Sequence, residues 1–442
     1  MKRYLVYKDS GLPWLGEIPE HWELTSIRGI TKSVNRRNQP NLPLLAVYRD
    51  YGVIFRDARD DNHNVIPEDL SNYKLVEPGN LVLNKMKTWQ GSLGVSEYRG
   101  IVSPAYIVCE VTAKVEQKFL NYLLRCHRYV FAYNTISYGV RVDQWDMRYE
   151  DFKQIPIFIP PLEEQKAIAQ FINRKLAQIN QFICYKRRLI ELLNEQKTAL
   201  INRAVTKGLD PDIPMKPSGI EWLGEIPRHW DVAPLYTRYS VQLGKMLNQD
   251  AVQGIAPAPY LRNANVQWDA IDFTDLFQMD FDLQERKKYE LLVGDLLVCE
   301  GGEVGRTAIW NGELRECYFQ KTLHRLRPLK CYDNSRFLFY VLYAATKIGV
   351  FTANVNKSTI GHLTAEKLKK YCFVFPLWSE QKQIINYLDT ETAKFDQAIA
   401  QAEKEIELIQ EYRTTLISDA VTGKIDVRDT LERGAALVAG GV

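Results

Sequence analysis

Two polar loops, at residues 84–90 and 300–306, hold side chains that can form hydrogen bonds with nucleic-acid bases. The first loop has the sequence NKMKTWQ and the second has the sequence EGGEVGR. Arginine and lysine suit guanine, asparagine and glutamine suit adenine, glutamate can accept from cytosine, and lysine with serine or threonine binds phosphate. Basic, amide and aromatic residues interleaved in this way favour a nucleic-acid-binding surface.

Loops of the same kind occur in both halves of the chain, and they supply the candidate DNA-binding residues. In the first half these residues are Arg36, Arg37, Asn84, Lys85, Lys87, Trp89, Gln90, Tyr138, Arg141 and Gln144. In the second half they are Lys245, Arg262, Asn263, Asn265, Glu300, Arg306, Asn356, Lys357 and Ser358. An ordinary surface loop explains any single residue equally well, but glycine-bounded polar loops on two copies of one scaffold favour recognition.

Patterns typical of catalysis or metal binding are missing from the sequence. The stretch Gly301–Thr307 resembles a phosphate-binding loop, but it lacks the lysine and places Glu303 where a phosphate would be repelled. The six histidines are dispersed without His-x-x-x-His or His-Glu-x-x-His spacing, and no Gly-x-Ser-x-Gly motif occurs. The sequence therefore predicts neither a catalytic site nor a metal site.

A repeated segment marks where each half begins. WLGEIP, then one residue, then HW spans Trp14–Trp22 and recurs at Trp222–Trp230. Its large apolar residues are anchors, its glycine permits a tight turn, and its proline stiffens the chain. We expect each copy to seat its domain where the opposite long helix ends. We also expect His21 and His229 to form structural hydrogen bonds rather than to act as general bases.

Two long segments, 160–210 and 376–426, repeat without gaps at an offset of 216 residues. Each is predicted to be a single helix, because neither proline nor glycine interrupts roughly 43 residues, which would span about 65 Å. Glu163 and Glu164 fall in the first turn of the first helix, where carboxylates are favoured, and Gly208 can cap its end.

Both helices keep one heptad register, which is typical of a coiled coil. In the first helix the a and d positions are Leu176, Ile183, Ile190, Lys197, Ala204 and Ile172, Ile179, Lys186, Leu193, Leu200. In the second they are Thr392, Ile399, Ile406, Arg413, Ala420 and Leu388, Phe395, Ala402, Ile409, Leu416. The basic residue at one a position in both copies is expected to specify register. Intramolecular antiparallel pairing, with a domain at either end, is the economical arrangement.

The predicted fold is α/β, with two α/β domains separated by two long antiparallel coiled-coil helices in a pseudo-two-fold repeat. In each domain a turn leads into an apolar strand, at residues 77–83 and 293–298, and an aromatic-rich helix follows, at 119–133 and 337–350. The predicted boundaries are 1–160 for the N-terminal domain, 161–207 for the first long helix, 208–219 for a linker, 220–375 for the C-terminal domain, 376–424 for the second long helix and 425–442 for a tail.

Composition is that of a folded, cytoplasmic protein without a membrane segment. The 442 residues are 46% hydrophobic and carry a net charge of +3, so a positive field would have to be local, as at Arg286–Lys288 or Lys321–Arg327. The seven cysteines are scattered without a Cys-x-x-Cys pair, which favours reduced thiols. No run of about eighteen apolar residues occurs, so no membrane span is expected.

Taken in order, these features resemble the specificity subunit of type I restriction–modification systems. The resemblance covers residues 10–426 and lies in the doubled order: each half opens with WLGEIP-x-HW, and each domain ends at Pro-x-x-x-Glu-Gln, where a long helix begins. The two Glu-Gln pairs are Glu164–Gln165 and Glu380–Gln381.

The resemblance implies a non-catalytic subunit that binds double-stranded DNA. Each domain would be a target recognition domain for one half of an asymmetric, bipartite site, and the helices would set the spacer and dock two methyltransferase subunits. Restriction subunits, which translocate DNA, would join the complex. This chain would bind no cofactor itself, because S-adenosylmethionine, ATP and Mg2+ belong to the partner subunits.

Two other functions stay open from the residues alone. One is a structural rod-and-globule scaffold that joins two proteins without contacting DNA. The other is a cryptic nuclease built around residues 300–306.

Overall fold

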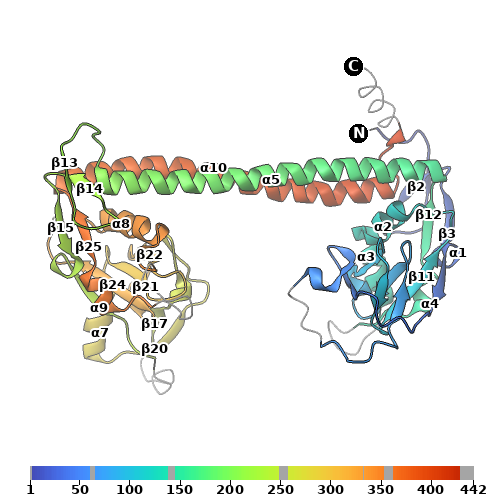
Figure 1. Ribbon diagram of the computed structural model, residues 1–442, viewed down its shortest axis with the longest axis horizontal. Coiled ribbons are helices and arrows are strands. Elements are labelled where there is room, and N and C mark those ends of the chain that lie inside the picture. The colour runs from blue at the N-terminus through green and yellow to red at the C-terminus, as the bar shows by residue number, and fades with distance from the viewer. Residues whose placement is uncertain are drawn as a thin grey trace. The chain divides into compact units, whose positions relative to one another are not determined.

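The computed structural model describes residues 2–59, 65–137, 145–247, 257–331, 333–352 and 362–428. The chain divides into two compact units, which are drawn in Figure 1. The N-terminal unit comprises residues 1–186 and 404–442, and the C-terminal unit comprises residues 187–403. Each unit therefore combines one domain with a part of both long helices.

The N-terminal unit is built from short strands and helices that lead into the first long helix. Its strands are β1 (Tyr7–Asp9), β2 (Glu17–Pro19), β3 (Glu23–Ser26), β4 (Thr31–Val34), β5 (Leu45–Tyr48), β6 (Gly52–Phe55), β7 (Lys74–Val76), β8 (Leu81–Asn84), β9 (Leu93–Val95), β10 (Gly100–Val102), β11 (Tyr106–Val111) and β12 (Pro156–Ile159). Its helices are α1 (Ile27–Ile30), η1 (Arg56–Ala58), η2 (Thr88–Gln90), α2 (Gln117–Arg125), α3 (His127–Ile136), α4 (Tyr149–Phe152) and the beginning of α5 (Leu162–Lys207).

The C-terminal unit follows the same plan. Its strands are β13 (Met215–Pro217), β14 (Glu225–Pro227), β15 (Asp231–Pro234), β16 (Tyr239–Leu243), β17 (Pro257–Leu261), β18 (Val266–Gln267), β19 (Ala270–Ile271), β20 (Phe277–Asp280), β21 (Leu296–Cys299), β22 (Thr307–Ile309), β23 (Tyr318–Phe319), β24 (Leu323–Pro328) and β25 (Cys372–Phe375). Its helices are η3 (Leu235–Thr237), η4 (Asn263–Asn265), α7 (Leu283–Tyr289), α8 (Ser335–Lys347), α9 (Ala365–Lys370) and the beginning of α10 (Trp378–Val421).

One antiparallel four-stranded sheet recurs in both units. Its strand order is β4-β11-β8-β9 in the N-terminal unit and β16-β24-β21-β22 in the C-terminal unit. Gly79 and Gly294 stand in the turns before β8 and β21 with φ angles of 87° and 91°, a conformation that glycine adopts at little cost. These matching sheets and turns confirm the predicted repeat of one fold.

A helix next to each sheet connects the sheet to the long helices. In the N-terminal core, Phe119 and Leu123 of α2 belong to the same buried cluster as Ile168 and Ile172 of α5. In the C-terminal unit, α8 shares a buried cluster with the first turns of α10. Burial of these apolar side chains holds each domain on the helix that follows it.

The prediction of one helix at residues 119–133 was wrong in the N-terminal unit. Cys126 is extended, with φ −70° and ψ 152°, and it ends α2 and caps the start of α3. Its carbonyl oxygen accepts from the backbone N–H of Tyr129 and of Val130. The break lets the hydroxyl of Tyr133 donate to the carbonyl oxygen of Leu124, at 2.8 Å.

The long helices are antiparallel, as predicted. In the N-terminal unit Lys186 of α5 forms an ion pair with Glu405 of α10, at 2.6 Å. In the C-terminal unit Lys197 pairs with Asp396, also at 2.6 Å. Residues further along α5 therefore pair with residues earlier in α10, so the two helices run in opposite directions. Many of the predicted a and d residues are buried, among them Ile172, Ile179, Ile183, Ala204, Leu388, Thr392, Ala402, Leu416 and Ala420.

Candidate nucleic-acid interface

The loops that follow β8 and β21 occupy equivalent places in the two units. Both loops leave the third strand of the repeated sheet and lead into its edge strand. The backbone N–H of Met147 donates to the carbonyl oxygen of Lys85 at 3.0 Å, and that of Leu363 donates to Glu300 at 2.9 Å. Lys85 and Glu300 are therefore equivalent positions, and so are the residues that face them.

In the N-terminal unit this loop borders a cavity of about 880 Å3. Asn84, Lys87 and Gln90 line the cavity, as do four basic or acidic residues that precede η2 in the chain: Arg49, Asp50, Arg56 and Arg59. With Lys87 and the three arginines the lining holds four basic groups, and Asp50 is the one acidic group among them. This balance attracts the phosphates of a nucleic acid.

Three of the predicted residues in this unit offer polar atoms to the cavity. The side chains of Lys87 and Gln90 have no hydrogen-bonding partner in the described part of the chain. The side-chain amide oxygen of Asn84 accepts from the backbone N–H of Met86, at 3.2 Å. Lys87, Gln90 and the amide NH2 group of Asn84 can therefore meet a ligand without breaking contacts inside the domain.

The other predicted residues of the N-terminal unit are held by neighbours. Lys85 forms an ion pair with Asp146, at 2.8 Å. The indole N–H of Trp89 donates to the carbonyl oxygen of Met86, at 3.1 Å, and its ring lies 5.1 Å from that of Trp145. Two exposed arginines also have partners within the domain, Arg36 with Glu110, and Arg37 with Asn35 and Asn72.

In the C-terminal unit the equivalent loop borders a cavity of about 800 Å3. Four side chains of its lining have no hydrogen-bonding or ion-pair partner among the described residues, and they are Glu300, Gln320, Lys321 and His362. Both cavities have a lysine and a glutamine, but the glutamate and the histidine of this cavity have no counterpart of the same type in the N-terminal cavity. Equivalent cavities with different polar linings are suited to different ligand sequences.

The remaining predicted residues of this unit are occupied inside the domain. The Asn263 amide donates to Gly301 at 2.7 Å and accepts from Arg306 at 3.0 Å. Asn265 is 2% exposed, and its amide donates to two backbone carbonyl oxygens. Arg262 and Lys245 form ion pairs with Asp275 and Glu285 respectively.

Six predicted residues lie outside the described residues: Tyr138, Arg141, Gln144, Asn356, Lys357 and Ser358. DNA contact stays a prediction for all nineteen candidates. The sequence reasoning did not single out Arg49, Arg56, Arg59, Gln320 or His362. A signal existed for Lys321, which begins the basic stretch 321–327.

A carboxylate at the start of each long helix binds the His-Trp pair of the repeated segment. Glu164 accepts from the indole N–H of Trp22 at 3.0 Å and lies 2.8 Å from the His21 ring nitrogen. Glu380 makes the same two contacts, at 2.9 Å with Trp230 and 2.8 Å with His229. We call this arrangement the carboxylate clasp. It confirms the structural hydrogen bond predicted for both histidines.

The glutamine that follows each clasp carboxylate ties the helix start to its domain. Gln165 accepts from the backbone N–H of Glu116 and donates to the Pro160 carbonyl oxygen, at 2.8 and 2.9 Å. Gln381 does the same with Asn334 and with the carbonyl oxygen of residue 376, both at 3.0 Å. Glu116 and Asn334 cap α2 and α8, so the Glu-Gln pair joins the domain helix, the clasp and the long helix.

The end of the opposite long helix meets the repeated segment in each unit, as expected. Gly423, two residues beyond α10, lies so close to Pro19 and Trp22 that a Cβ atom there would clash with the proline ring. Gly208, one residue beyond α5, lies against Trp230. Both glycines have positive φ angles, 70° and 75°, as helix caps commonly do.

The N-terminal clasp has a third donor. The hydroxyl of Tyr4 donates to Glu164 at 2.7 Å, and Glu164 is less exposed than Glu380, at 6% against 21% of the side chain. Burial, followed by the hydrogen bond to Glu164, raises the pKa of Tyr4 well above its ordinary value. The hydroxyl therefore stays protonated and donates to the carboxylate.

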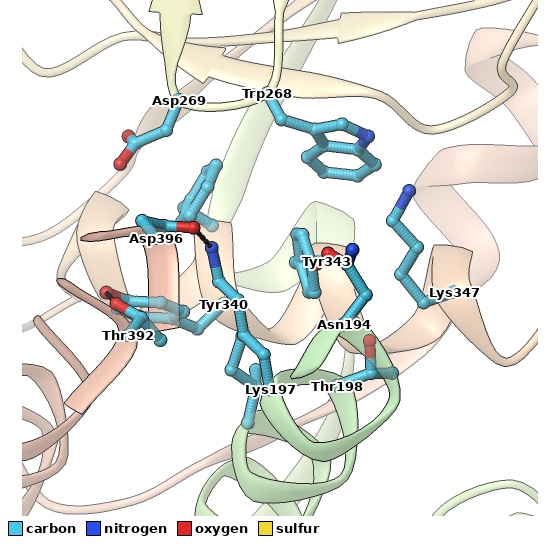
Figure 2. A pocket seen from close by; sticks show the side chains of 12 residues that line it. Asn194, Lys197, Thr198, Trp268, Asp269, Tyr340, Tyr343, Lys347, Thr392 and Asp396 are labelled. Carbon is cyan, nitrogen blue, oxygen red and sulfur yellow. Dashed lines mark hydrogen bonds and ion pairs between the residues drawn. The ribbon is translucent and has the colours of Figure 1, made fainter. Parts of the chain in front are cut away.

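Another pocket of the C-terminal unit, of about 500 Å3, lies where α8 and the β18–β19 turn face the two long helices (Figure 2). Lys197 reaches across it to Asp396, at 2.6 Å. Lys347 pairs with Glu303, which also accepts from the indole N–H of Trp268. Because its charged groups already pair within the unit, this pocket is a weaker candidate for DNA than the two loop cavities.

No group of three or more potential metal ligands occurs among the described residues. All seven cysteines are free. Burial raises the pKa of the Cys299 thiol, next to Glu300, to about 11, so that thiol stays protonated near neutral pH. Within the described ranges, no helix has both the length and the apolar character needed to cross a membrane.

The two loop cavities lie within two segments that match one protein family. The model for the type I restriction modification DNA specificity domain matches residues 19–184 and again residues 242–408. A similar curated protein is the type I restriction enzyme MjaVIII specificity subunit of Methanocaldococcus jannaschii. It is 23% identical over 429 residues, which cover 93% of this chain and 95% of that protein.

Solved structures show the same fold. A chain from a structure on complex assembly and conformational transition of the type I R-M system superposes with a TM-score of 0.69 at 15% identity, covering 92% of this chain and 99% of that one. The HsdS subunit from Thermoanaerobacter tengcongensis superposes with a TM-score of 0.52 at 14% identity, covering 94% and 100%. With two copies of the family domain, this chain belongs to the DNA specificity subunits of type I restriction–modification systems and has two target recognition domains.

Proposed function

We propose that this chain binds double-stranded DNA at an asymmetric, bipartite site, and that each unit recognises one half of it. The observation that carries the proposal is the pair of equivalent loop cavities with different linings. Arginine, lysine and amides line the N-terminal cavity, whereas Glu300, Gln320, Lys321 and His362 line the C-terminal cavity. Since base edges are distinguished by their pattern of donors and acceptors, different linings select different bases.

The coiled coil has two further roles in the proposal: it sets the spacer between the half-sites, and it docks two methyltransferase subunits. α5 is one helix of 46 residues, which at 1.5 Å per residue is about 69 Å long. One turn of DNA is roughly 34–36 Å, so this length suits half-sites between one and two turns apart.

Catalysis belongs to the partners in this proposal. The methyltransferase and restriction subunits would supply S-adenosylmethionine, ATP and Mg2+, and the complex would act in the cytoplasm. For the alternative of a nuclease at residues 300–306, the support is weak. Arg306 and Glu303 are occupied by Asn263 and Lys347, and a metal-dependent nuclease would need several ligands close together.

Exchange of one domain tests DNA recognition. Replacing residues 22–155 with the corresponding segment of another specificity subunit should change the N-terminal half of the methylated site and leave the other half unchanged. The measurement is a map of methylated adenines in DNA from cells that express the chain with its methyltransferase. A scaffold without DNA contact would leave both halves unchanged, and a change in both halves would contradict modular recognition.

Lengthening the helix tests the spacer. Inserting four residues, about one helical turn, beside Glu195 in α5 and four more beside the paired stretch of α10 should alter the spacer length that the complex accepts. The two half-site sequences should stay the same, because no cavity residue changes. The same methylation map gives the result, and an unchanged spacer would show that the helices do not set it.

A further inference from the structure

We propose that Glu300 selects a base that carries an amino group in the major groove, which is either adenine, through N6, or cytosine, through N4. The inference rests on the proposed DNA recognition. It assigns the selection of one base in the C-terminal half-site to one side chain.

The backbone of Glu300 is held from both sides. Its N–H donates to the carbonyl oxygen of Thr322 at 3.0 Å, and its own carbonyl oxygen accepts from Leu363 at 2.9 Å. Thr322 and Leu363 flank the cavity from two other segments of the chain. The backbone of Glu300 is therefore in place before any ligand arrives and only the side chain has to be ordered, which lowers the entropic cost of recognition.

The equivalent place in the N-terminal unit has the opposite charge. There Lys85 occupies the position of Glu300, and Asp146 occupies that of His362, since Met147 and Leu363 make the same backbone hydrogen bond. Lys85 and Asp146 form an ion pair at 2.8 Å.

In the C-terminal unit the two equivalent residues, Glu300 and His362, do not pair with each other. Neither the carboxylate of Glu300 nor the ring of His362 has a hydrogen-bonding or ion-pair partner in the described part of the chain, and both line the cavity. At these equivalent positions the N-terminal unit therefore has an ion pair, whereas the C-terminal unit has two polar groups without partners that line the cavity.

An open carboxylate on a DNA-binding surface needs a donor. The phosphates of DNA repel it, so a contact with the backbone cannot be its role. In the major groove, guanine and thymine present acceptors, whereas adenine N6 and cytosine N4 present donors. Glu300 would thus gain a hydrogen bond from adenine or cytosine and would be repelled by guanine or thymine. Such repulsion of the wrong partner strengthens specificity.

Two hydrogen-bond donors beside Glu300 suit a base pair that contains either adenine or cytosine. The Lys321 ammonium and the Gln320 amide line the same cavity without partners among the described residues. They could donate to N7 of an adenine, or to O6 and N7 of the guanine that pairs with a cytosine. The identity of the base is therefore left to the experiment.

The first test is Glu300→Gln, which is nearly isosteric and can both donate and accept. Methylated adenines are mapped in cells that express each variant with the methyltransferase. One position of the C-terminal half-site, adenine or cytosine in the wild type, should lose its preference over guanine and thymine by roughly ten-fold or more. Glu366→Gln removes the same charge from an exposed residue paired with Lys369, and it should leave the site unchanged.

The second test is the double variant Glu300→Lys with His362→Asp, which installs the residues of the N-terminal pair. The new pair should close, and selection at the same single position should be lost while the N-terminal half-site is kept. An unchanged C-terminal half-site in both Glu300 variants, or relaxation spread over several of its base pairs, would overturn the inference. Wild-type chain that directs no methylation at any bipartite site would instead contradict the proposed function.

Discussion

Glu164→Ala is expected to destabilise the N-terminal unit by about 4 kcal/mol, because breaking a buried, charged hydrogen-bond network leaves its partners unsatisfied. Three donors converge on this carboxylate: the Tyr4 hydroxyl, the Trp22 indole N–H and the His21 ring. Alanine would leave Tyr4 and Trp22, which are 5% and 1% exposed, without an acceptor. Urea unfolding followed by tryptophan fluorescence measures the loss.

Glu380→Ala is the matched comparison. Glu380 is more exposed than Glu164, and it contacts Trp230 and the half-exposed His229. Its loss should cost the C-terminal unit less, about 2 kcal/mol, because water can replace part of the contact. Glu163→Ala, at an exposed residue next to Glu164 that pairs with Lys166, should change little. Equal losses for Glu164→Ala and Glu380→Ala would show that the third donor contributes nothing.

Trp230→Ala should destabilise the C-terminal unit by about 4 kcal/mol, which is typical for a buried tryptophan. The Trp230 side chain is fully buried in the core cluster of that unit and also donates to Glu380. Alanine would leave a cavity at the point where Gly208 and the domain meet. Differential scanning calorimetry of the full chain measures the loss of stability. The transition that moves to lower temperature in the variant is assigned to the C-terminal unit.

Trp222→Ala, in the same repeated segment, should cost less. Sequence reasoning treats both tryptophans as anchors and predicts a loss of stability or assembly for Trp222→Ala. In the structure Trp222 is partly exposed and contacts Phe373 edge-on, at 6.1 Å between ring centres. A loss for Trp222→Ala as large as that for Trp230→Ala would contradict this ranking.

The repeated architecture could be predicted because it follows from periodicity. Heptads and an offset of 216 residues are visible in the chain itself, and hydrophobic burial enforces them in the fold. The break at Cys126 could not be predicted, because no proline or glycine marks it. It depends on tertiary packing that overrides the helical pattern of the surrounding residues.

The candidate site could be predicted only in part, because residue type does not reveal which polar groups are already used. Asn265 and Gln320 are both amides that could recognise adenine. In the structure Asn265 is buried and bonded to two backbone carbonyl oxygens, whereas the Gln320 side chain has no partner in the described ranges and lines the cavity. The amide of Asn265 forms hydrogen bonds with the backbone of a local turn, whereas the amide of Gln320 is available to a ligand.

The carboxylate clasp has a consequence for how new specificities arise. Its contacts agree to within 0.1 Å between the two units, although the domains they hold differ in their cavity linings. A repeated WLGEIP-x-HW segment and a long helix that begins with Glu-Gln border both domains. An exchanged domain that keeps the His-Trp pair would find the same attachment ready for it. Evolution could therefore replace one half of the target site in a single crossover, without any compensating change in the helices.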